Sequence, residues 1–209
     1  MMRDEYIEPA RETSVEVKIS KSRFIGRVII AKSAEDARAS LRQVSELHKQ
    51  ATHNCWAYRI GSAGSEEYYS DDGEPTGTAG KPILGAILKK ELVNTLVVVT
   101  RYFGGIKLGV RGLIEAYAST ASMALDAAGT IERIPVRSYR IRLVYDEMGL
   151  ISRLTGSFGV SEDDLEFIFT EDVLLTCKLP LADAEKFEQA LDEMLHTSRI
   201  MEWKAISDD

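Results

Sequence analysis

The chain has 209 residues, of which 44% are hydrophobic, so it can bury either one large core or two small ones. It contains no apolar run near the roughly 20 residues that span a bilayer, and its charged N-terminus lacks the apolar region of a signal peptide. Cys55 and Cys177 lie far apart, and no Cys/His pair has metal-ligand spacing, which predicts a cytoplasmic protein with two plain core cysteines.

Acidic residues are concentrated in the last third of the chain. The net charge of −7 argues against a protein that coats nucleic acid over its whole surface. Residues 1–134 carry 18 Lys and Arg against 17 Asp and Glu, whereas residues 135–209 carry 8 against 16. We therefore expect an anionic partner to meet the first segment, and a basic protein partner to meet the second.

The first segment predicts a mixed α+β domain over residues 1–134. Residues 1–13 are polar without a clear period and predict a loop, while Ser33 followed by Asp36 predicts the start of a capped helix. The continuous β-branched run at 95–100 predicts a central strand buried on both faces. The other elements, in chain order, are strands at 15–19 and 24–31, a helix at 34–50, strands at 53–61 and from 68, and helices at 83–88 and 113–128.

A second domain is predicted over residues 135–209, beginning at Pro135. Its elements are a strand at 136–145, a helix at 148–158, strands at 165–170 and 173–179, a helix at 183–195 and a strand at 199–206. The order βαββαβ within about 70 residues is the ferredoxin-like plan. We find no catalytic set of residues in this domain.

The segment from Ser70 to Gly112 carries the chemistry of the chain. It opens with SDDGEPTGTAGKPIL and closes with RYFGGIKLGVRG, so glycines and charges gather at both ends of the buried strand. Glycine-rich turns expose backbone N–H groups, and a helix start adds more, which together favour a phosphate group. Lys107 and two arginines would supply charge, and Tyr102 or Phe103 could stack on an unpaired base. The predicted anion- or RNA-binding residues are Gly77, Thr78, Gly80, Lys81, Arg101, Tyr102, Gly104, Gly105, Lys107 and Arg111.

Three other interpretations of this segment and its neighbours stay open. Asp72 or Glu74 could pair internally with Arg101 or Lys107, leaving the glycines to form tight turns. With Asp71, the same two acids could hold Mg²⁺ beside a phosphorylated substrate. The acidic second domain could instead be the main binding surface, for a basic protein. Because GTAGKP lacks the spacing of a phosphate-binding P-loop and no Ser/His/Asp or Cys/His set is present, the sequence favours a non-enzymatic protein without a cofactor.

The paired motifs SDDGEPTGTAGKPIL and VVVTRYFGGIKLG, followed by a helix that begins with Gly-Leu and contains Ala-Tyr, resemble the IMPACT family of the bacterial YigZ type over essentially the whole chain. The resemblance implies a first domain like the second domain of ribosomal protein S5. It implies a second domain like the last domain of the translocation elongation factor. Eukaryotic IMPACT proteins act in translational control, so the resemblance implies a translation-linked role with RNA or the ribosome as partner.

Individual positions match the motifs of this family, with two departures. Residues 72–75, 77–80 and Pro82 match the first motif, and residues 101–105 and 107–109 match the second. Family members commonly have small residues where this chain has Arg111, and often an arginine where it has Glu115. Compared with those family members, this chain therefore has one more cation beside the loop, at Arg111, and one fewer on the helix, at Glu115.

Overall fold

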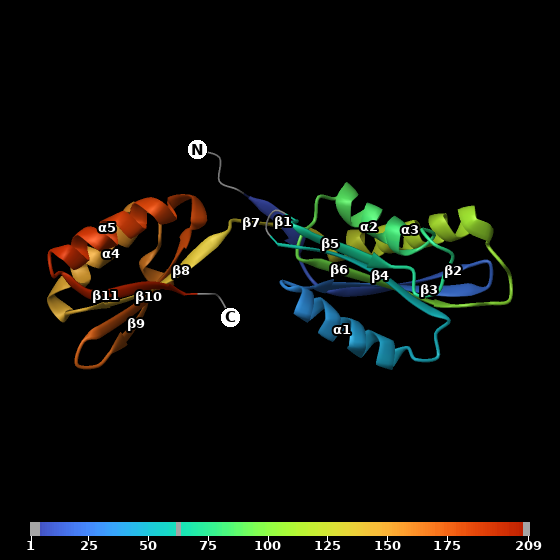
Figure 1. Ribbon diagram of the computed structural model, residues 1–209, viewed down its shortest axis with the longest axis horizontal. Helices are drawn as coiled ribbons and strands as arrows, with labels where there is room; N and C mark the ends of the chain where they lie inside the picture. Colours follow the sequence, from blue (N-terminus) through green and yellow to red (C-terminus); the bar gives the residue numbers. More distant parts are fainter. Residues whose placement is uncertain (1–4, 62–63, 207–209) are drawn as a thin grey trace. The chain divides into compact units, whose positions relative to one another are not determined.

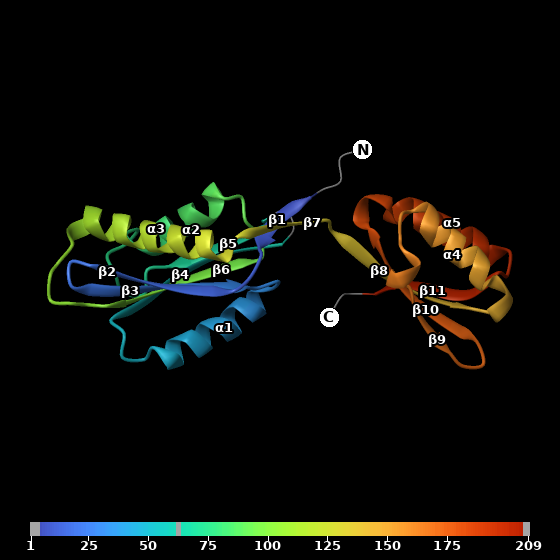
Figure 2. The ribbon, with the colours of Figure 1, turned by 180° about the vertical axis from the view of Figure 1, so that it is seen from behind.

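The computed structural model describes residues 5–61 and 64–206 of the chain. The chain divides into two compact units, of which Tyr6–Arg133 is the first and residues 134–206 belong to the second (Figures 1 and 2). The sequence placed this boundary one residue later, between residues 134 and 135. The outermost residues of the two predicted domains, 1–4 and 207–209, lie outside the described part, as do residues 62–63 of the first.

A five-stranded antiparallel sheet forms the middle of the first unit. Its strand order is β2-β3-β6-β4-β5, with β6 in the centre. Helices α2 and α3 cover one face of the sheet, and α1 covers the other. The strands are β2 (Thr13–Ile19), β3 (Ser22–Ile30), β4 (His53–Ile60), β5 (Glu66–Ser70) and β6 (Thr95–Tyr102), and the helices are α1 (Ala34–Leu47), α2 (Gly80–Lys89) and α3 (Gly109–Ala128).

Strand β6 is buried on both faces, as its β-branched sequence predicts. Val97 and Val99 pack toward α2 and α3, whereas Leu96 and Val98 pack toward α1. All four side chains are fully inaccessible to solvent. Because side chains alternate along a strand, this one run supplies the centre of both hydrophobic layers.

The N-terminal segment differs from the loop that its sequence predicts. Within it, β1 (Tyr6–Pro9) pairs antiparallel with β7 (Thr130–Arg133), which the sequence also did not indicate. The buried Glu8 carboxylate accepts hydrogen bonds from Arg133 Nε and Asn94 Nδ2, at 2.8 and 3.2 Å. A polar segment becomes a strand here because a distant segment satisfies its backbone and its charge.

The predicted helices of the first unit form, with shifted ends. The Ser33–Asp36 capping box that begins α1 is complete, because each side chain accepts a hydrogen bond from the other residue's backbone N–H. Helix α3 begins four residues before the predicted Leu113, at Gly109, which has a φ of +70°. The cap position of α2 is Ala79, which has no capping side chain, and the Asp71 carboxylate binds the N–H groups of Ala79 and Gly80 instead.

The second unit is a four-stranded antiparallel sheet with two helices on one face. The strand order β11-β8-β10-β9 places the first strand between the last and the third, which is the ferredoxin-like arrangement. Helices α4 and α5 lie on the same side of this sheet in both views (Figures 1 and 2). The two-domain α+β class is thereby confirmed, while the S5-like assignment of the first unit stays a prediction. The elements are β8 (Val136–Leu143), η1 (Tyr145–Glu147), α4 (Met148–Ser157), η2 (Glu162–Asp164), β9 (Glu166–Phe169), β10 (Val173–Pro180), η3 (Leu181–Asp183), α5 (Ala184–His196) and β11 (Ile200–Ile206).

Candidate functional site

The two ends of the segment from Ser70 to Gly112 come together at the end of β6. His53 at the start of β4 is the register partner of Arg101 near the end of β6, and Thr52 N donates to Arg101 O at 2.8 Å. A pocket of about 470 Å³ opens at this place. It is lined by the start of β4, the Glu74–Pro75 turn, the end of β6 and residues 107–110 before and within the first turn of α3.

A buried ion pair forms one wall of this pocket. Arg101 Nη1 donates to Glu74 Oε1 at 2.6 Å, and only 6% and 4% of the two side chains are exposed. The guanidinium carbon also lies 5.4 Å from the ring centre of Phe24 and 5.3 Å from that of Phe103. The internal pairing that the sequence left open is therefore confirmed for Glu74 and Arg101.

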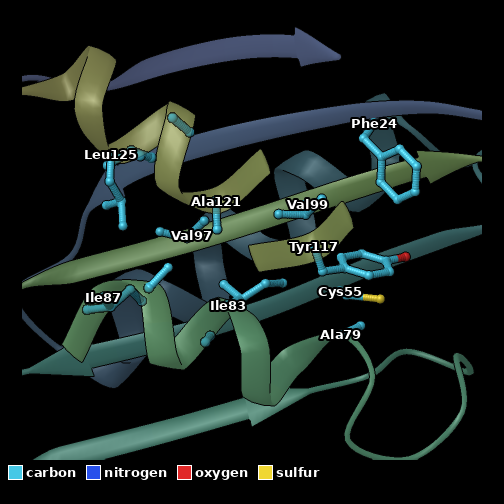
Figure 3. Close-up of a cluster of buried hydrophobic side chains, with 14 of the residues drawn as sticks. Phe24, Cys55, Ala79, Ile83, Ile87, Val97, Val99, Tyr117, Ala121 and Leu125 are labelled. Carbon is cyan, nitrogen blue, oxygen red and sulfur yellow. The ribbon is translucent and has the colours of Figure 1, made fainter. Parts of the chain in front are cut away.

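Tyr117 and Cys55 extend this buried network into the hydrophobic core. Tyr117 Oη donates to Glu74 Oε1 at 2.9 Å, and the ring lies beside Cys55 (Figure 3). Burial raises the pKa of the Cys55 thiol to about 12, and burial likewise raises the pKa of the Tyr117 phenol. Both groups are neutral at physiological pH, so Cys55 is a core thiol donating to Asp71 O and not a thiolate nucleophile.

The backbone N–H groups at the start of α2 are already bound within the chain. Asp71 Oδ1 accepts from Ala79 N and Gly80 N, at 3.0 and 2.8 Å, and Asp71 Oδ2 accepts from Gly77 N at 2.8 Å. This carboxylate occupies the place that a phosphate would take at a helix start. Thr78 is buried as well, with its hydroxyl donating to Pro75 O at 2.6 Å. A ligand anion would have to displace Asp71 to reach these groups.

The neighbouring acids have partners of their own. Asp72 Oδ2 accepts from Asn54 N, and the Asp72 carbonyl lies 2.7 Å from His53 Nδ1. Within residues 5–61 and 64–206, no three His, Cys, Asp or Glu side chains are grouped in a way that could hold a metal ion. The Asp72 and Glu74 carboxylates are instead bound by groups of the chain itself, Asn54 N and the Arg101 guanidinium.

The two adjacent aromatic residues after β6 have different environments. Tyr102 is half-buried, with its hydroxyl 3.0 Å from His48 Nδ1 and the Arg23 guanidinium carbon 4.3 Å from its ring centre. Phe103 is 45% exposed and borders the pocket. Phe103, rather than Tyr102, is therefore the ring available for stacking.

The three predicted surface cations also differ. Lys107 is exposed on the pocket lining, and no carboxylate in the described part of the chain pairs with it. Arg111 is 93% exposed, but its Nε donates to Glu115 Oε1 at 2.9 Å, so the added cation is neutralised on the helix itself. Lys81 is exposed at the start of α2, outside the pocket lining.

Comparison with known proteins matches the Impact N-terminal domain to residues 20–125. The chain belongs to the IMPACT family. IMPACT family member YvyE of Bacillus subtilis is 36% identical over 90% of this chain and 80% of that protein, and IMPACT family member YigZ of Escherichia coli is 33% identical over 90% and 92%. A solved structure of a hypothetical protein matches with a TM-score of 0.69 and 32% identity, covering 100% of both chains.

The two IMPACT motifs thus meet in space, and much of their charge is used within the fold. Sequence reasoning did not find the part played by Thr52 or His53 in the pocket, because both lie in or beside an ordinary strand pattern. It also missed that Asp71 holds the start of α2. The signal for Asp71 is an acid shortly before a helix that has no Ser, Thr, Asp or Asn at its cap position.

Gly104 of the second IMPACT motif is required for close backbone contact. A Cβ atom placed at Gly104 would overlap the backbone carbonyl of Lys21, at the turn between β2 and β3, while Gly104 N donates to Ser22 Oγ. At Gly105, by contrast, a φ of +87° is the constraint and a Cβ would meet nothing within 4 Å.

We expect Gly104→Ala to lower the free energy of unfolding by about 1–3 kcal/mol, because two backbone segments would have to separate. Gly85→Ala is the matched control, since a Cβ there meets nothing within 4 Å and α2 gains helix propensity. Urea unfolding of both variants gives the comparison. Equal stability of the Gly104 variant and the parent chain would contradict the close contact.

Among the described residues, no helix is long and apolar enough to cross a membrane.

Proposed function

We propose that this chain is a non-enzymatic, translation-linked cytoplasmic protein that binds RNA, free or on the ribosome, at the pocket of its first unit. The link to translation rests on the IMPACT family resemblance. The observation that carries the RNA assignment is the exposed ring of Phe103 beside Lys107, a cation without a carboxylate partner in the described residues, on one open pocket. An unpaired base on the ring and its phosphate on Lys107 would use both features.

The charges at the pocket indicate that base stacking contributes more than phosphate binding. Glu74 neutralises Arg101, and Lys107 is left as the free cation on the lining. Each base stacked on an aromatic side chain contributes about 1–3 kcal/mol to binding. One phosphate contact to a single strand adds a slope of about −0.7 in the plot of log affinity against log salt. The pocket alone would therefore bind RNA with a shallow dependence on salt.

We place the proposed site on the pocket and away from the start of α2. Gly77 N and Gly80 N donate to Asp71, and Lys81 lies outside the pocket lining. Of the residues predicted to bind an anion or RNA, Lys107 is the one proposed to contact RNA directly. Of the two aromatic residues that could stack on a base, Phe103 is proposed for this role and not Tyr102. Arg101 forms part of the pocket wall, and Gly104 and Gly105 constrain the loop between Phe103 and Lys107.

We expect Phe103→Ala to weaken binding of a fluorescent uridine 12-mer by about 5- to 150-fold, the equivalent of one lost stacked base. Lys107→Ala should reduce the salt slope by about 0.7. Fluorescence anisotropy at 50–300 mM salt measures both effects.

Two matched substitutions serve as controls for this experiment. Phe169→Ala removes an aromatic side chain of similar exposure, 56%, from the second unit, and Lys81→Ala removes a cation outside the pocket lining. Both should leave the affinity within about twofold. A loss on Lys81→Ala with none on Phe103→Ala would move the site to the start of α2 and contradict the proposal.

A further inference from the structure

The open face of the sheet in the second unit carries two exposed cations without a carboxylate partner among the described residues, although the unit as a whole is acidic. Helices α4 and α5 cover the other face, where Ile141, Leu175 and Phe187 are buried between sheet and helices. The face without helices carries a pocket of about 410 Å³, whose lining includes the cations Arg140, Arg142 and Lys204 and the acids Asp172 and Glu202.

Two cations on this face lie directly opposite one another. In the register of the sheet, Arg140 on β8 is the partner of Lys204 on β11, and its partner on the other side, on β10, is the uncharged Thr176. Both cations are exposed, and neither has a carboxylate partner among the described residues. Like charges directly opposite on neighbouring strands destabilise a sheet, so this pair would be relieved by an anion placed between its two members.

The adjacent row of the sheet has a different character. Arg142 is paired with Asp172, which holds the pKa of that carboxyl below its usual range. Its β11 partner is the acid Glu202. Its β10 partner is Leu174, which in turn lies opposite Ile168 on β9. Ile168 is 57% exposed. An apolar pair thus lies one row away from the unpaired cations, within reach of a single bound molecule.

We infer that this face binds single-stranded RNA, with a phosphate between Arg140 and Lys204 and a base against Leu174 and Ile168. The ligand follows from the juxtaposition of two unpaired cations with an apolar pair in which Ile168 is exposed and Leu174 is half-buried. This arrangement matches the alternating phosphates and base faces of a single strand. This RNA contact is additional to the pocket of the first unit and does not depend on it. An anion would then bind the second unit, although the net negative charge of that unit favours a basic partner.

The test compares two double variants of the full chain. Arg140→Ala/Lys204→Ala removes both cations from the sheet face, and the control Arg153→Ala/Lys186→Ala removes two exposed cations from α4 and α5. Binding of a fluorescent uridine 12-mer is measured over a range of salt concentrations. Loss of two phosphate contacts should reduce the salt slope by about 1.4. A variant that equals the parent chain in affinity at 1 M salt would then bind about 25-fold more weakly than the parent at 0.1 M. The control should change neither value. Equal losses in the two variants would overturn the inference, because net charge alone would then account for the binding.

A charge reversal separates binding from folding. Arg140→Glu places opposite charges at the Lys204 pair, so we expect the melting temperature at low salt to rise by about 2–5 °C while RNA binding falls. A fall in both would overturn the inference, because Arg140 would then be structural. Poly-glutamate of matched charge is the competing probe, and binding as tight as that of the 12-mer would assign the face to acidic peptides instead.

The same measurements distinguish this inference from the proposed function. If Phe103→Ala has no effect while Arg140→Ala/Lys204→Ala weakens binding, the first-unit pocket is excluded and the sheet face remains. The reverse result overturns the sheet face and leaves the pocket.

Discussion

Arg101→Ala is expected to lower the free energy of unfolding by about 3–5 kcal/mol, the cost of removing one partner from a buried ion pair. Glu74 would remain buried with 4% of its side chain exposed. Among the described residues, it would keep the hydrogen bond from Tyr117 Oη at 2.9 Å and the contact with His53 Nε2 at 3.9 Å. Urea unfolding followed by circular dichroism measures the change, with a melting curve to verify that the variant is folded before the titration.

A double variant tests whether the effect comes from the unpaired charge. Replacing both partners with apolar residues, as in Glu74→Leu/Arg101→Met, removes the buried charge entirely and should cost less than either single substitution. Tyr117→Phe, which deletes one hydrogen bond to Glu74, should cost about 1.5–3 kcal/mol. A double variant less stable than Arg101→Ala would show that the pair itself stabilises the fold.

Loss of RNA binding in an Arg101 variant would have two possible causes. Arg101 pairs with Glu74 and lies against Phe103, so its removal would distort the pocket wall as well as delete any direct contact with RNA. Phe103 and Lys107 are exposed, so substitutions there change the ligand contact with little effect on the fold.

Asp71→Ala is expected to lower the free energy of unfolding by at least about 2 kcal/mol, the upper value for a lost helix cap, because three amide N–H groups lose their acceptor. Asp71→Asn should lie between the parent and the alanine variant. Its amide oxygen can still accept from Ala79 N and Gly80 N, but its NH₂ group would face the donor Gly77 N.

Urea unfolding ranks the three proteins, and hydrogen exchange at Gly77, Ala79 and Gly80 localises the effect. Glu115→Ala is the control, because its carboxylate is 65% exposed and pairs with Arg111 on the helix surface, where a pair contributes at most about 0.5 kcal/mol. Unchanged exchange at the three amides in Asp71→Ala would contradict the role given to this carboxylate.

The elements that the sequence predicts well are those that local pattern specifies. The run at 95–100 is β-branched at every position except Leu96, so the pattern alone indicates a buried central strand. The βαββαβ order of the second unit can likewise be predicted, because the spacing of apolar residues in each segment is typical of either a strand or a helix. By contrast, β1 and β7 are short, and each depends on a partner more than 120 residues away in the chain.

The site was only partly predictable, because motifs show which residues are present and not which are bound to each other. The sequence left open whether Glu74 pairs with Arg101, and the structure shows that it does. The role of Asp71 at the start of α2 was missed, because its signal is an acid several residues before the helix and not at the cap position. The pairing of Arg140 with Lys204 depends on the register of the sheet, which the sequence does not specify. Net charge averages over all faces of a domain, whereas a binding surface depends on one face.

RNA binding at the first-unit pocket can be tested by cross-linking the full chain to a 4-thiouridine 12-mer and mapping the attached peptides by mass spectrometry. We expect cross-links to the loop that contains Phe103 and Lys107, and we expect them to be lost in Phe103→Ala and retained in Lys81→Ala. Cross-links confined to other surfaces, or equal yields in the Phe103 variant and the parent, would contradict it.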